Sequence, residues 1–290
     1  MLQVTTDLCR KAAELNYSAK NRKGNILCFS DGARLIVTGD LHGHQRNFEK
    51  IADYADLKNN PDTHVVFQEI LHGGPEDLAG GCTSFKVFFE VLRYKLDYPD
   101  QVHLIMGNHD TAIITDHSVL KNGKEMNQAL KNGMRQYFGG ESEAINEAVR
   151  GYLISQPIAI RCANRIWMSH SLPADRFVAD FDVSIFDKKL EPDDMLRPKS
   201  LYTLTWGRRQ SKKALAELAK LFDVDYFILG HQPQPSGWAR FGDNLIILAS
   251  DHTRGCLISF DPTKSYTLNE LTECIVLLAS LAGPSAVIPG

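Results

Sequence analysis

The sequence predicts an α/β fold in which sheets and helices are stacked in layers. Short apolar runs, of the length of buried strands, alternate with segments whose apolar residues recur at helical spacing. The chain has 290 residues, 43% of them apolar and 23% charged, as in an ordinary globular protein with one large core. Because no linker, low-complexity segment or internal repeat divides it, we expect a single domain over residues 1–290.

The first half of the chain alternates between strands and helices. Residues 1–20 have apolar side chains near helical spacing and predict an N-terminal helix on the outside of the sheet. The apolar strands NILCFS and ARLIVTG flank the turn dipeptide Asp31-Gly32, so we expect a hairpin. Two amphipathic segments, NFEKIADYADL and SFKVFFEVLRYKL, predict helices, and the strand QVHLIM follows the second. This alternation indicates an α/β layered fold.

The second half returns to strands after a polar helical segment. We expect residues 120–153 to form a helical cap beside the functional site. The strands PIAIRC and RIWMSH come next, and the helix KKALAELAKLF precedes the strands DYFILGH, NLIILAS and GCLISFD. The apolar segment TECIVLLASLAGPSAVIPG predicts a last strand or helix and a loose end. A second strand-rich half thus completes the core.

Five apolar runs stop on side chains that can bind a metal ion. The candidate ligands are Asp40, His42, Glu69, Asn108, His170 and His231. Loops just beyond strands hold side chains rigidly, and open α/β sheets gather ligands at the carboxyl ends of their strands. Imidazole nitrogen combined with carboxylate and amide oxygen suits manganese, iron or zinc. The sequence therefore predicts a site for two divalent or trivalent cations.

Two short motifs carry the strongest signal. In GDLHG, residues 39–43, flanking glycines let Asp40 and His42 reach one ion without backbone strain. In GNHD, residues 107–110, Asn108 can give an amide oxygen to a metal while His109 stays free to act on a substrate. Each motif stands behind a strand. Their combination favours a catalytic metal site.

With these motifs, residues 36–260 resemble the calcineurin-like metallophosphoesterases, and specifically their phosphoprotein phosphatase branch, the serine/threonine phosphatase-like proteins. The resemblance implies a β-sandwich of two mixed sheets flanked by helices, in four layers α-β-β-α. It also implies a dinuclear site. Asp40 and His42 would bind the first metal, and Asn108, His170 and His231 the second.

The second family motif is altered. Where the family has GDxxDRG, residues 68–74 read QEILHGG. The carboxylate that bridges the metals is then Glu69, one methylene longer than aspartate. The aspartate that orients the acid histidine aligns with His72, and the phosphate-binding arginine aligns with Gly73. We expect metal binding to survive, with substrate preference and rate left open.

The resemblance implies hydrolysis by water that two cations activate and aim at phosphorus. His109 is the expected general acid. That role needs a neighbouring group to fix its tautomer, and Asp110 and His72 are the candidates.

Three further residues are candidate substrate-binding groups. Arg208 and Arg209 could replace the lost arginine, because a guanidinium binds phosphate oxygens in a bidentate manner. His252 aligns with residues at the edge of the family's cleft.

These motifs leave three functions open. A phosphomonoesterase acting on a phosphoprotein or small phosphoester is the leading hypothesis. The lost arginine leaves a phosphodiesterase or dinucleoside polyphosphate hydrolase possible. The altered second motif also allows a metal-binding or phosphate-binding module without catalysis.

Composition narrows the partners. A net charge of -3 gives no electrostatic reason to expect nucleic acid. The six cysteines form no CxxC pair and lie in or beside apolar runs, which indicates core thiols in a reducing compartment. We expect a cytoplasmic enzyme, because the chain opens without a secretory signal and no run reaches the roughly 20 apolar residues of a membrane span.

Overall fold

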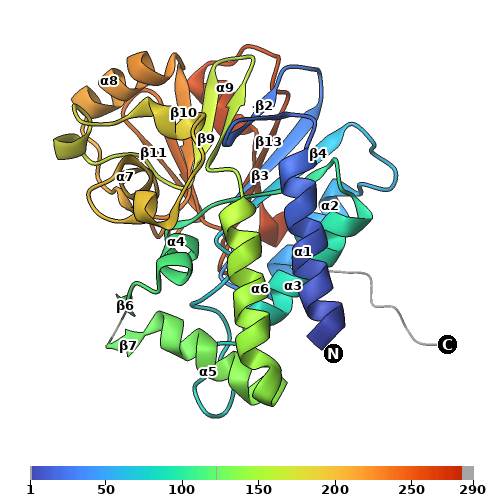
Figure 1. The fold of residues 1–290 in the computed structure, drawn as a ribbon. Coiled ribbons are helices and arrows are strands. Elements are labelled where there is room, and N and C mark those ends of the chain that lie inside the picture. Colours follow the sequence, from blue (N-terminus) through green and yellow to red (C-terminus); the bar gives the residue numbers. More distant parts are fainter. Residues whose placement is uncertain (1, 122, 283–290) are drawn as a thin grey trace.

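The apolar runs form two mixed sheets. The computed structural model describes residues 2–121 and 123–282 (Figure 1). One sheet has the order β14 (Ile275–Leu277), β13 (Cys256–Phe260), β3 (Arg34–Asp40), β4 (Thr63–Gln68) and β5 (Val102–Ile105). The other has the order β1 (Arg22–Lys23), β2 (Ile26–Phe29), β8 (Ala159–Cys162), β9 (Ile166–Ser169), β10 (Tyr226–Leu229), β12 (Leu245–Leu248) and β11 (Trp238–Phe241). The sandwich that the family resemblance implied is confirmed.

Both faces of each sheet are buried, as the continuous apolar runs require. In β3, Leu35 and Val37 belong to the core between the sheets, together with Ile228 and Ile246 of the other sheet. The intervening Ile36 belongs to the outer core, where helices cover the sheet. Successive side chains of a strand point to opposite faces of the sheet. In a strand of consecutive apolar residues, alternate side chains therefore pack into the core between the sheets and into the core beneath the helices.

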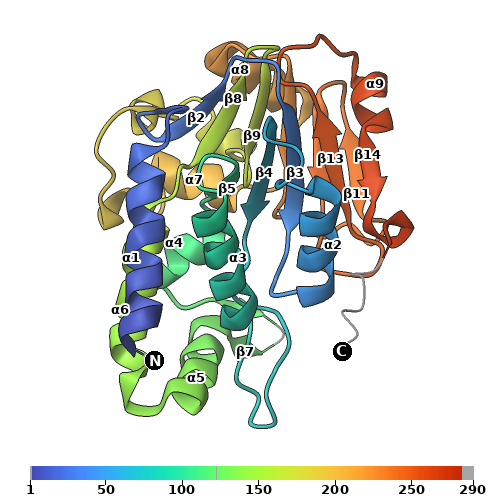
Figure 2. The same ribbon diagram turned by 90° about the vertical axis from the view of Figure 1, so that its right-hand side faces the viewer.

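Helices cover the outer faces, and those expected from periodicity are confirmed. The helices of the described residues are α1 (Leu2–Ser18), α2 (Gln45–Ala55), α3 (Phe85–Asp97), α4 (Asn108–Thr115), α5 (Met126–Phe138), α6 (Ser142–Ser155), α7 (Ser200–Trp206), α8 (Lys212–Phe222) and α9 (Leu268–Glu273). Of these, α4, α7 and α9 were not predicted. Short 3-10 turns occupy η1 (Gly139–Glu141), η2 (Asp175–Phe177), η3 (Val183–Phe186), η4 (Pro192–Met195) and η5 (Leu278–Ser280). The N-terminal α1 runs beside α6 (Figures 1 and 2). Between the two helices, the buried Asn16 amide donates to Ser155 Oγ at 2.8 Å.

The predicted hairpin of β2 and β3 is wrong, although both strands exist. β2 pairs in parallel with β8, whereas β3 pairs with β4 and β13 in the other sheet. A two-residue hairpin loop of type I′ needs positive φ at both central residues. Neither Asp31 nor Gly32 has a positive φ, and the turn instead carries the chain from one sheet to the other.

The expected cap at residues 120–153 contains a feature that periodicity missed. It begins with a two-stranded hairpin, β6 (Leu120–Lys121) and β7 (Lys124–Glu125), before α5 and α6. The hairpin and α5 extend beyond the sheets, while α6 returns along α1 (Figure 1). Only part of the segment can therefore border a site at the strand ends.

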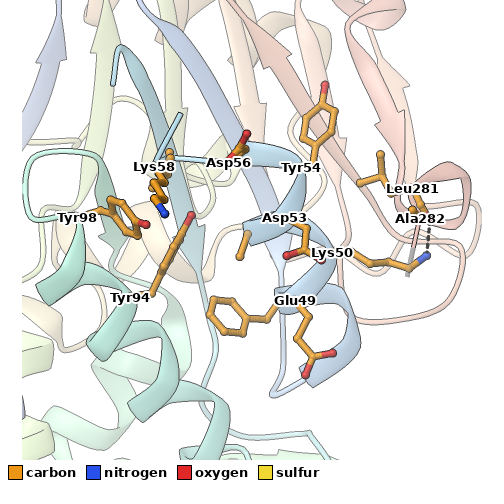
Figure 3. Close-up of a pocket in the computed structure, with 13 residues that line it drawn as sticks. Glu49, Lys50, Asp53, Tyr54, Asp56, Lys58, Tyr94, Tyr98, Leu281 and Ala282 are labelled. Atoms are coloured by element: carbon orange, nitrogen blue, oxygen red, sulfur yellow. Dashed lines mark hydrogen bonds between the residues drawn. The ribbon is translucent and has the colours of Figure 1, made fainter. Parts of the chain in front are cut away.

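The end of the described chain is attached to α2. The buried Lys50 ammonium donates to Leu278 O at 2.6 Å and to Leu281 O at 3.0 Å, beside a groove of about 950 Å³ between α2 and α3 (Figure 3). Of the segment TECIVLLASLAGPSAVIPG, for which we predicted a last strand or helix and a loose end, β14 confirms the strand, and residues 283–290 lie outside the described residues. No described helix combines the length and apolar character needed to cross a bilayer.

Candidate functional site

Strand ends from both sheets meet at one place. Asp40 is the last residue of β3, Glu69 follows β4, and Asn108 begins α4 just after β5. His170 follows β9 of the other sheet, and His231 lies two residues beyond β10. Their side chains surround or lie directly behind a cavity of about 250 Å³. The predicted residues that line this cavity are Asp40, His42, Glu69, His72, Asn108, His109, Arg208 and His231.

Four side chains form a close donor group around His170. Its Nε2 lies 2.5 Å from Glu69 Oε2, 2.8 Å from Asn108 Oδ1 and 3.1 Å from His231 Nδ1. His231 Nδ1 is also 2.8 Å from Asn108 Oδ1. Carboxylate and carbonyl oxygens only accept hydrogen bonds, and each neutral imidazole also presents one lone pair. Such converging lone pairs suit a bound cation, so this donor set fits the expected second metal.

Gln68 orients His170 and is a site residue that we did not predict. Its amide Nε2 donates to Thr38 O at 2.7 Å, which directs Oε1 toward His170 Nδ1 at 2.9 Å. An acceptor at Nδ1 holds the proton there and frees Nε2 to bind a metal. The available signal was a glutamine that directly follows the apolar residues 65–67 at the end of a strand.

A second donor group lies on the other side of Glu69. Ligand atoms of His42, Glu69 and His72 lie within 4.8 Å of one another, and Asp40 Oδ2 is 4.0 Å from His42 Nε2. Asp40 Oδ1 accepts the His231 backbone N–H at 2.9 Å and thereby links the two groups. Mixed imidazole and carboxylate donors fit the expected first metal, with Glu69 shared between both groups.

Four residues of the site have backbone conformations that side chains rarely adopt. The φ angles are 45° at His42, 42° at Glu69, 69° at His72 and 66° at His231. A non-glycine residue in the left-handed region costs of order 1 kcal/mol or more, and such residues cluster at functional sites. The surrounding structure therefore imposes these side-chain directions against local preference.

Burial and charge set the protonation of the donors. Burial, with repulsion from Glu69, raises the pKa of Asp40 to about 7. Burial also acts to raise the pKa of Glu69, but His170 and His109 hold it well below its usual range. Burial opposes protonation of His170, yet Glu69 and Asp40 raise its pKa. Without a metal, Glu69 and His170 thus form a buried ion pair.

His109 lies beside the donors, but the expected partners do not fix its tautomer. Its Nε2 is 3.8 Å from Glu69 Oε1, and its buried Nδ1 has no hydrogen-bond partner among the described residues. Asp110 Oδ2 instead accepts the Gly107 N–H at 2.9 Å and caps α4. His72 stacks on the His109 ring, with 3.1 Å between ring centroids. Burial lowers the pKa of His109 to about 2.

The mouth of the cavity carries two cations, and only one was predicted. Arg208, after α7, and Lys121, in β6, both line the cavity. Their side chains are exposed, and within residues 2–121 and 123–282 neither forms an ion pair with a carboxylate. Lys121 was missed because its segment read as helical and its place over the cavity depends on the hairpin.

Two predicted substrate contacts lie outside the cavity lining. Arg209 is exposed and has a left-handed φ of 58°, so its side chain leaves the backbone in a different direction from that of Arg208. His252 Nε2 lies 3.0 Å from Gln234 O, and its Nδ1 accepts the Arg254 N–H at 3.1 Å. Both ring nitrogens of His252 are thus engaged with the loop backbone.

Solved structures share this fold at low sequence identity. A protein serine/threonine phosphatase from Saccharomyces cerevisiae, with similarity to human phosphatase PP5, has a TM-score of 0.66 and 15% identity over 89% of this chain and 82% of its own. A cold-active protein-tyrosine phosphatase of the psychrophile Shewanella has a TM-score of 0.61 and 13% identity over 94% and 84% of the two chains. At such identities the likeness concerns the fold alone.

Curated relatives match a shorter stretch. A symmetrical bis(5'-nucleosyl)-tetraphosphatase of Buchnera aphidicola subsp. Baizongia pistaciae is 28% identical over 97 residues, 32% of this chain and 31% of the relative. That of Buchnera aphidicola subsp. Acyrthosiphon pisum is 25% identical over 88 residues, 30% and 28% of the two chains. The chain thus spans less than a third of these relatives. The sequence profile of the calcineurin-like phosphoesterase family matches residues 33–235, and the chain belongs to that family.

Proposed function

We propose that the chain is a metal-dependent phosphoester hydrolase that acts on phosphomonoesters of a protein or a small molecule. The observation that carries the proposal is the position of Glu69 between two donor groups. Its Oε1 lies 2.7 Å from His72 Nε2, and its Oε2 lies 2.5 Å from His170 Nε2. One carboxylate facing two sets of metal-binding atoms supports a pair of adjacent ions.

The chain's own residues supply substrate binding and a proton. When bound, two such ions activate water and neutralise charge on phosphoryl oxygens. Arg208 and Lys121 place positive charge at the mouth of the cavity, where a phosphoryl group enters. His109 borders the same cavity and protonates the leaving oxygen. Together these groups favour a compact phosphoryl substrate.

The low pKa of His109 describes the protein without substrate. Burial opposes the imidazolium, while the negative charge of Glu69 favours it. A phosphoryl dianion in the cavity adds negative charge beside the ring and raises the pKa further.

Hydrolysis of an aryl phosphate with added Mn²⁺ tests the proposal. Wild-type protein is expected to turn over, and His109→Ala is expected to lose about 10²- to 10⁴-fold in kcat, the range for a general acid. His117→Ala, an exposed histidine that does not line this cavity, is the control. Metal binding without turnover of any phosphoester would contradict the proposal and favour a binding module.

A second candidate is hydrolysis of a dinucleoside polyphosphate, favoured by the match to two bis(5'-nucleosyl)-tetraphosphatases. Initial rates separate the alternatives: release of the aryl alcohol is followed for the aryl monoester and for bis(4-nitrophenyl) phosphate, and formation of ADP for diadenosine tetraphosphate. A higher kcat/KM for the diester or the tetraphosphate would overturn the monoesterase assignment and leave the metal site in place.

A further inference from the structure

The proposed mechanism gives His72 no role in substrate binding or proton transfer. The family has an aspartate there to orient the acid histidine, but His72 stacks on the His109 ring and does not hydrogen-bond to it. The side chain is 1% exposed, and its backbone N–H donates to Ser84 Oγ at 2.8 Å. This imidazole is therefore buried and held firmly, and orienting His109 does not explain the direction of its ring.

The His72 ring faces the first donor group. Its Nε2 lies 2.7 Å from Glu69 Oε1, and its ring meets that of His42 edge to face, with 4.4 Å between centroids. One ligand atom from each of these three side chains lies within 4.8 Å of the other two. Ligands at about 2.0–2.2 Å from a shared ion are separated from each other by about 3–4 Å. Small side-chain adjustments therefore bring all three onto one ion.

We propose that His72 is a ligand of the first metal ion. The inference rests on the dinuclear site of the proposed function and changes its composition. The first ion is held by Asp40, His42, Glu69 and His72, and the second by Glu69, Asn108, His170 and His231. Each ion then has two imidazoles and two oxygen ligands. Donor sets this similar favour two ions of the same borderline metal.

Cobalt is a suitable probe, because Co²⁺ replaces borderline ions and its unpaired electrons shift the N–H proton resonance of each coordinated imidazole. In wild-type protein loaded with Co²⁺ alone, we expect shifted, exchangeable resonances from four imidazoles. His72→Leu is expected to lose one of them and to bind one of its two Co²⁺ ions at least tenfold more weakly by calorimetry. His117→Leu, outside the cavity, is the matched control and is expected to keep all four.

Three shifted resonances in the wild type would overturn the proposal. So would a folded His72→Leu that keeps every resonance and its Co²⁺ affinity. Circular dichroism shows whether His72→Leu is folded. If it is not folded, the number of shifted imidazole resonances in the wild type, four or three, tests the proposal alone. In each of these outcomes two bound Co²⁺ ions leave the proposed function standing, whereas wild-type protein that binds no Co²⁺ would overturn both.

Discussion

Among single residues, Gln68 holds the His170 ring in the direction that the proposed second metal site requires. It fixes the direction of His170 through Nδ1, while Thr38 O fixes the amide itself. Gln68→Leu is expected to weaken binding at the second metal site about 10- to 100-fold, the usual effect of losing such a partner. Calorimetric titration with Mn²⁺ measures it, with the exposed-helix variant Gln3→Leu as the control. Equal affinities for Gln68→Leu and wild type would show that packing alone orients His170.

A pair of histidines outside the site, one buried and one half-buried, predicts a dependence of stability on pH. His64 Nδ1 lies 3.2 Å from His103 Nε2, and burial lowers the pKa of both, that of His103 well below its usual range. Below about pH 6.5, both imidazoles therefore become protonated in the unfolded chain before they do in the folded chain. Each such histidine lowers the free energy of unfolding by up to about 1.4 kcal/mol per pH unit below that value.

His103→Leu removes one of these groups. We expect a shallower fall in the free energy of unfolding between pH 6.5 and 5.5 than in the wild type, measured by urea unfolding at each pH. His117→Leu, which changes an exposed side chain, is the control and is expected to keep the wild-type slope. Parallel pH profiles for His103→Leu and wild type would contradict this account.

Among the elements, the β6–β7 hairpin brings a cation to the cavity from a segment distant from the motifs. Lys121→Ala is expected to raise KM for a phosphomonoester about tenfold, because a charge-assisted hydrogen bond contributes about 1.5–3 kcal/mol. kcat is expected to change less. The control is Lys124→Ala on the same hairpin, whose ammonium pairs with Glu76 at 2.7 Å. If both variants raised KM equally, the effect would come from a change in the hairpin and not from loss of the Lys121 ammonium.

The attachment of the chain end to α2 depends on one buried ammonium. Lys50 donates to Leu278 O and Leu281 O, and Figure 3 shows it reaching from α2 to the second of these. Lys50→Ala is expected to destabilise the fold by about 1.5–3 kcal/mol, since hydrogen bonds from a charged group are lost. Lys58→Ala, an exposed lysine of the same groove, is expected to change stability little. Chemical unfolding distinguishes the two.

The sequence predicted the helices and strands themselves better than it predicted which strands pair with each other. An apolar run or a 3.6-residue period is local, so the apolar strands and α1, α2, α3 and α8 could be read directly, whereas β1, β6, β7 and β11 were not predicted. Pairing is not local, and the turn at Asp31-Gly32 joins two sheets. The candidate ligands could be predicted because strand ends converge, but Gln68 and Lys121 depend on contacts that only the folded chain makes.

For the whole molecule, the site joins the two sheets. Glu69 and Asn108 extend from the five-stranded sheet, and His170 and His231 from the seven-stranded one. An ion held by both sheets stabilises the folded state by about 2.7 kcal/mol at a free concentration of about 100 Kd. Chelation is therefore expected to lower Tm by several degrees, measured by calorimetry with and without Mn²⁺. A Tm indifferent to both chelator and Mn²⁺ would show that no ion spans the sheets.

The distance along the chain between the two sides of the site also matters for synthesis. The contact between Asp40 and His231 closes a span of 191 residues. At about 5–20 residues per second, a ribosome needs roughly 10–40 s to pass from the first to the second. During that interval the early carboxylates exist without their late imidazoles. The complete set of candidate ligands therefore exists only after His231 has been synthesised.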